Sequence, residues 1–126
     1  MARGIAGVAG GLVAWFLVAT ALNSLLRVSW PGYAQAELPM TFTLAMMAAR
    51  LLVGGLSSVG AGLVLAWIAK RAGIPAKVLG TVLIALFIPV HYTLWDKFPV
   101  WYHLIFLASL MPLALLGARL MPRSRR

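Results

Sequence analysis

Residues 51–71 read LLVGGLSSVGAGLVLAWIAKR, an apolar run closed by two basic residues. The nineteen residues from Leu51 to Ala69 carry no charged side chain. A helix rises about 1.5 Å per residue, so roughly 20 apolar residues cross the hydrocarbon core of a bilayer. Lys70 and Arg71 stand where such a span would leave the membrane. This stretch therefore predicts a transmembrane helix.

The same pattern recurs along the chain. We expect four spans, at about residues 4–26, 40–69, 78–95 and 99–118. The first is longer than the apolar region of a signal peptide, which favours a retained span. The chain is 63% hydrophobic and only 10% charged, whereas soluble domains carry about 25% charged residues. The predicted fold class is all-α: a single membrane domain over residues 1–126 that forms an integral four-helix bundle.

Basic residues set the expected orientation of this bundle. Two of them, Arg27 and Lys97, fall on one side of the four-span map, together with both acids, Glu37 and Asp96. Eight fall on the other side: Arg3, Lys70, Arg71, Lys77, Arg119, Arg123, Arg125 and Arg126. Because positive loops stay inside, both termini are predicted to be cytoplasmic.

Charge and cysteine content narrow the classes of partner and cofactor. A net charge of +9 would suggest nucleic acid in a soluble protein. Here the basic residues flank apolar spans, so we expect contacts with anionic membrane lipids and no nucleic-acid partner. The chain has no cysteine, which excludes disulfides, thiolate chemistry and iron–sulfur clusters. We expect no cofactor.

Small residues at four-residue spacing predict close contacts between helices. In lipid, such residues let two backbones approach each other. The first span carries Gly7 and Gly11, and the second carries Gly54, Ser58, Gly62 and Ala66. This pattern serves packing inside one chain or self-association of several chains, and the sequence leaves both open.

Polar side chains gather toward the end of the bundle opposite the Lys70–Lys77 connection. Thr20, Asn23 and Arg27 share one face of the first span by their spacing. His91 and His103 each lie about one turn from this end, on consecutive antiparallel spans, so they should meet at similar depth. Ionisable side chains in or near a membrane are candidates for a functional role, because they are costly to place there. The candidate ligand-binding cluster is Asn23, Arg27, Glu37, Arg50, His91, Asp96 and His103.

Several kinds of chemistry fit this cluster. Two histidines with Asp96 or Glu37 would suit a divalent metal, and two histidines alone would suit haem. His91, Asp96 and Arg50 together would suit acid–base work or the binding of an anionic headgroup. No metal signature such as HExxH is present, so we assign no metal ligand and no catalytic residue. In the structural alternative, the histidines bind carbonyls or water and Arg50 pairs with Asp96 or Glu37.

Residues 91–103, HYTLWDKFPVWYH, together with residues 30–33, WPGY, and the stretch from Met46 to Arg50, resemble small four-span bacterial inner-membrane proteins known only as uncharacterised. That resemblance implies a location in the bacterial inner membrane and a multi-pass topology, and it implies no activity. Small multidrug transporters have a similar size, but their mechanism uses an acid within the first span, where this chain has none.

Strong packing motifs without catalytic motifs favour a non-enzymatic accessory or scaffold protein. Such a protein would self-associate or pack with a membrane protein partner. The alternative is a carrier or enzyme that handles a small molecule or lipid through the polar cluster.

Overall fold

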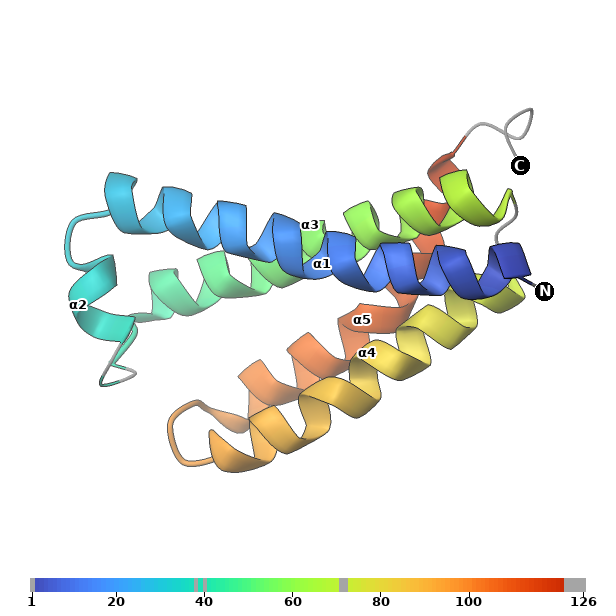
Figure 1. The fold of residues 1–126 in the computed structure, drawn as a ribbon. Coiled ribbons are helices and arrows are strands. Elements are labelled where there is room, and N and C mark those ends of the chain that lie inside the picture. Colours follow the sequence, from blue (N-terminus) through green and yellow to red (C-terminus); the bar gives the residue numbers. More distant parts are fainter. Residues whose placement is uncertain (1, 38, 40, 71–72, 122–126) are drawn as a thin grey trace.

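The computed structural model describes residues 2–37, 39, 41–70 and 73–121. This part of the chain forms α1 (Ala2–Ser29), α2 (Tyr33–Glu37), α3 (Leu44–Ala69), α4 (Ile74–Thr93) and α5 (Val100–Leu120), and it contains no strand (Figure 1). The helices α1, α3, α4 and α5 are long and apolar enough to cross a membrane. The all-α prediction is confirmed, and the four apolar helices indicate a multi-pass membrane protein.

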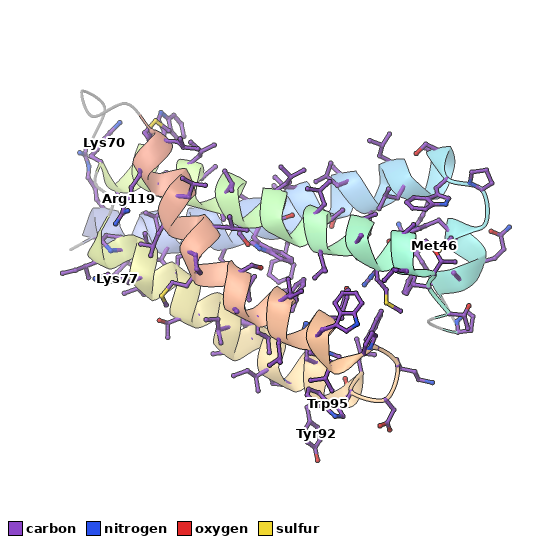
Figure 2. All side chains as sticks on the ribbon, turned by 180° about the vertical axis from the view of Figure 1, so that it is seen from behind. Met46, Lys70, Lys77, Tyr92, Trp95 and Arg119 are labelled. Atoms are coloured by element: carbon purple, nitrogen blue, oxygen red, sulfur yellow. The ribbon has the colours of Figure 1, made fainter. Side chains whose placement is uncertain are left out.

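Two helical hairpins make up the bundle. In Figure 1, α1 and α3 run side by side and α2 lies across the end where they connect, while α4 and α5 form the second pair. The helix α3 is central because it packs against both α1 and α5. Figure 2 shows Lys70, Lys77 and Arg119 together at one end, called the basic end here. Tyr92 and Trp95 lie at the opposite, aromatic end.

The second span begins later than predicted. The helix α3 starts at Leu44 because the side chain of Thr43 caps it, accepting a hydrogen bond from the Met46 N–H at 3.2 Å. Proline suits the first turn of a helix, so the sequence also predicts a start at Pro39. Pro39 instead lies in the preceding connection, and residue 40 falls outside the described residues. In the first turn of α3, Met46 is buried among aromatic side chains.

The third span begins earlier than predicted. The helix α4 starts at Ile74, and Pro75 fits into its first turn, where a missing N–H costs nothing. Gly73 precedes it with φ +67°, a conformation that favours glycine. Pro89 lies inside α4 and Pro112 lies inside α5.

Predicted small residues mediate contacts inside this chain. A Cβ added at Gly62 would collide with the backbone carbonyl of Ala114 on α5. A Cβ at Gly11 would lie 2.9 Å from the carbonyl oxygen of Ala61, so α1 and α3 also touch through their backbones. These faces are thus occupied within one chain. Self-association of the protein stays a prediction.

The interior has a central cluster and a second cluster at the aromatic end. In the centre, the Trp15 indole N–H donates to the Ser58 hydroxyl at 3.0 Å, which ties α1 to α3. The second cluster brings α2 onto the ends of α3 and α5. Its buried members are Tyr33, Ala36, Phe42, Met46, Phe98 and Tyr102. Packing at this end fixes the polar groups described next.

Candidate functional site

Arg50 is the centre of the polar cluster. It lies in the second turn of α3, about 9 Å along the axis from the first residue of that helix. Its Nε donates a hydrogen bond to the hydroxyl of Tyr102 at 3.3 Å, and its Nη1 donates to the hydroxyl of Tyr33 at 3.1 Å. The Tyr33 hydroxyl in turn donates to Oδ1 of Asn23 at 3.1 Å. Arg50 therefore links α1, α2, α3 and α5.

Aromatic rings also surround this cation. The Arg50 guanidinium carbon lies 4.5 Å from the centre of the Phe42 ring and 6.0 Å from that of Phe98. Ring faces attract a cation and contribute most where water is excluded. The phenyl rings and the tyrosine hydroxyls hold the guanidinium in place, but they are neutral and leave its charge uncompensated.

The predicted ion pair between Arg50 and Asp96 or Glu37 is wrong. Glu37 binds Arg27 through both carboxylate oxygens, at 2.6 and 3.0 Å, because α2 places it beside the last turn of α1. Asp96 is exposed in the α4–α5 connection and forms no ion pair with a described residue. These are the chain's only two acidic residues. No carboxylate side chain of this protein therefore pairs with Arg50.

A cavity of about 260 Å³ lies beside Arg50 in the aromatic half of the bundle. All four long helices contribute to it. Five of its eleven lining residues are aromatic, and Arg50, Thr20, Asn23 and Tyr102 contribute polar groups. The lining residues are Trp15, Phe16, Ala19, Thr20, Asn23, Arg50, Val53, Gly54, Phe87, Tyr102 and Phe106.

Several of these polar groups have hydrogen-bond donors to spare. Nη2 of Arg50 makes no hydrogen bond to a described residue. The Tyr102 hydroxyl accepts from Arg50, so its own proton is free to be donated. The Asn23 side chain uses its carbonyl oxygen for Tyr33, which leaves the amide N–H groups. The cavity therefore offers donors and a positive charge, the complement of an anion.

His91 and His103 form a direct pair behind this cavity. Their Nδ1 atoms are 2.6 Å apart, so one ring donates and the other accepts. Both side chains are buried. The ring of His91 packs on Phe106 with centres 4.7 Å apart, and Phe106 lines the cavity. The histidines meet at similar depth, as expected, but they lie one layer away from the cavity space.

His103 is enclosed on its far side. Its ring stacks on Trp95 with centres 4.7 Å apart and planes 13° apart. Its Nε2 atom is buried and has no hydrogen-bond partner among the described residues. The metal interpretation required a third ligand, and within the described residues no three side chains of histidine, cysteine, aspartate or glutamate come together.

The structure thus divides the predicted cluster into three parts. Asn23 and Arg50 meet at the cavity, Arg27 pairs with Glu37, and His91 pairs with His103. Asp96 stands apart from all of them. Tyrosines prefer the membrane boundary, so the sequence alone predicts Tyr33 and Tyr102 as anchors there and misses their role beside Arg50. Both are buried, with exposed fractions of 0% and 3%.

Comparison of the chain with protein-family models, curated proteins and solved structures finds no match. The residues of the site are therefore the basis for a functional proposal.

Proposed function

We propose that this protein binds an anionic amphiphile, a lipid or lipid-like small molecule, in the cavity beside Arg50. The observation that carries the proposal is a cation inside a four-helix membrane bundle whose candidate carboxylates are engaged elsewhere or exposed. A charge in such surroundings is costly unless it is paired. A ligand phosphate or carboxylate supplies the missing negative charge and accepts from Nη2 of Arg50.

The cavity wall favours a ligand that also has an apolar part. Phe16 on α1 and Phe87 on α4 line the cavity, and their rings stack with centres 6.1 Å apart. Phe16 is 45% exposed, so this side of the cavity borders the outer surface of the bundle. In a bilayer that surface is covered by lipid. The head of an amphiphile would lie against Arg50, and its tail would pass beside these two rings.

We further propose that the protein resides in a bacterial inner membrane. Both termini, and with them the basic end, would face the cytoplasm, in keeping with the positive-inside rule. The cavity would then open in the outer half of the bilayer.

Titration with two amphiphiles of equal chain length tests the ligand proposal. Dodecyl phosphate is added to the protein in neutral maltoside micelles, and binding is measured by calorimetry. We expect one molecule to bind, and we expect Arg50→Gln to weaken that binding about tenfold to a hundredfold. The estimate follows from the ~1.5–3 kcal/mol that a hydrogen bond to a charged group contributes.

Lys97→Gln is the matched control, because Lys97 is an exposed cation at the same end and does not line the Arg50 cavity. We expect it to bind dodecyl phosphate like the unmodified protein. Far-ultraviolet circular dichroism checks that both variants remain helical. Equal affinity for dodecyltrimethylammonium, or unchanged phosphate binding by Arg50→Gln, would contradict the proposal.

The accessory or scaffold role expected from the sequence is the competing proposal. It requires a partner chain, and the small-residue faces that suggested one are in contact within this chain. Native mass spectrometry of the gently solubilised protein separates the two. A homo-oligomer or a copurifying membrane protein, without a retained anionic amphiphile, would favour the accessory role.

A further inference from the structure

A second cavity lies at the basic end, far from Arg50 along the helices. It has a volume of about 440 Å³ and is a groove between the first two turns of α1 and those of α4. Its lining is apolar throughout: Gly4, Ile5, Val8, Ala9, Ile74, Pro75 and Val78. None of these residues lines the Arg50 cavity, so the groove is a separate feature.

Small side chains keep this groove open. A Cβ added at Gly4 would meet only the Pro75 ring, at 4.0 Å, which is ordinary contact distance. Ala9 is exposed and carries only a methyl group into the space. On the other wall, Ile74 is 70% exposed. The gap between α1 and α4 is thus wide enough at this end to admit an apolar chain.

The charged residues next to the groove, Arg3 and Lys77, are both basic. Arg3 adjoins Gly4 on α1, and Lys77 adjoins Val78 on α4. Both side chains are exposed, and neither forms an ion pair with a described residue. Lys70 and Arg119 lie at the same end (Figure 2), whereas the two acids lie at the other end, Glu37 in α2 and Asp96 in the α4–α5 connection.

We infer that this groove is a binding site for an anionic phospholipid from the leaflet that surrounds the basic end. One acyl chain lies between α1 and α4, and the phosphate-bearing headgroup meets Arg3 and Lys77. The groove occupies the ends of both helices, which is the depth where a lipid's headgroup joins its chains. A zwitterionic lipid would fill the same apolar space but would gain less from the cations.

Native mass spectrometry after extraction from vesicles tests this site. The vesicles contain equal amounts of phosphatidylglycerol and phosphatidylcholine with identical chains. We expect the protein to retain phosphatidylglycerol preferentially. We expect Arg3→Gln and Lys77→Gln each to lower that preference about fivefold, the equivalent of ~1 kcal/mol per basic residue near an anionic surface at 1.4 kcal/mol per tenfold.

Filling the groove provides a second, independent variant. Ala9→Leu places a larger side chain in the groove from an exposed position, so the fold is kept while the acyl chain is displaced. Ala6→Leu is the matched control, because Ala6 is an exposed alanine of the same helix outside the groove. We expect loss of the retained lipid in Ala9→Leu only.

Each substitution is also made in a protein that carries Arg50→Gln. In that background, lipid bound at the aromatic end does not contribute to the retained lipid. Preferential retention that survives Arg50→Gln and disappears with Ala9→Leu supports the groove, whether or not the Arg50 cavity binds a ligand. Equal retention of both lipids would overturn the inference. So would identical behaviour of Ala6→Leu and Ala9→Leu, or a lipid-independent dimer that Ala9→Leu dissociates.

Discussion

Gly62→Ala is expected to destabilise the folded bundle by about 3 kcal/mol, near the upper end of the range for overpacked interiors. The added methyl group would collide with the Ala114 carbonyl and approach the Ala118 nitrogen to 2.7 Å. Both obstacles are backbone atoms, so no side-chain rotation relieves the contact. The helices α3 and α5 must move apart, and the contacts along their interface weaken together.

Unfolding in mixed detergent and dodecyl sulfate micelles, followed by circular dichroism, measures this effect. Gly4→Ala is the matched control, because its new methyl group meets only the Pro75 ring at 4.0 Å. Alanine favours a helix over glycine by about 1 kcal/mol, so the control should be neutral or slightly more stable. If Gly62→Ala unfolds at the same dodecyl sulfate fraction as Gly4→Ala, the close α3–α5 approach is wrong.

His103→Leu is expected to cost about 1–3 kcal/mol of folding free energy, whereas His91→Leu combined with His103→Leu should cost less than that single change. The single variant leaves Nδ1 of His91 without its partner in a buried place. An orphaned polar group carries its full desolvation penalty, but replacing both partners with apolar groups is often nearly neutral. The double variant also removes the unpartnered Nε2 of His103.

The same unfolding measurement, applied to both single variants and the double variant, gives a double-mutant cycle for the two histidines. Leucine is apolar and of moderate size, so the ring contacts with Trp95 and Phe106 are lost in both backgrounds and largely cancel. If the free-energy change in the double variant equals the sum of the two single changes, the histidines do not interact. A double variant that is less stable than either single variant would have the same meaning.

The sequence predicted the number of spans because run length and charge are local properties. It misplaced the start of α3, because the Thr43 cap competes with Pro39 as a helix start. It also misplaced the start of α4, because Gly73-Ile74-Pro75 is typical of a tight turn, although the first helical turn also accepts proline. These errors concern boundaries, which depend on a few hydrogen bonds rather than on hydrophobicity.

The candidate site was predictable only in part. Arg50 and the two histidines were found because ionisable residues are rare in apolar spans. Their partners depend on tertiary placement. Tyr33 reaches Arg50 because α2 lies back across the bundle after the turn at Gly32, where φ is +86°. Charge alone predicted an ion pair between Arg50 and a carboxylate. The short α1–α2 connection instead places Glu37 beside Arg27, which binds it.

The position of Arg50's partners along the chain bears on biosynthesis. Translation proceeds from the N-terminus, so Asn23 and Tyr33 already exist when Arg50 leaves the ribosome. Tyr102 follows 52 residues later. We therefore expect the first hairpin to enter the bilayer with Tyr33 available as a polar partner for Arg50, which offsets part of the cost of placing an arginine within a membrane. We expect the second hairpin, which carries Tyr102, to dock onto an arginine that Tyr33 already holds.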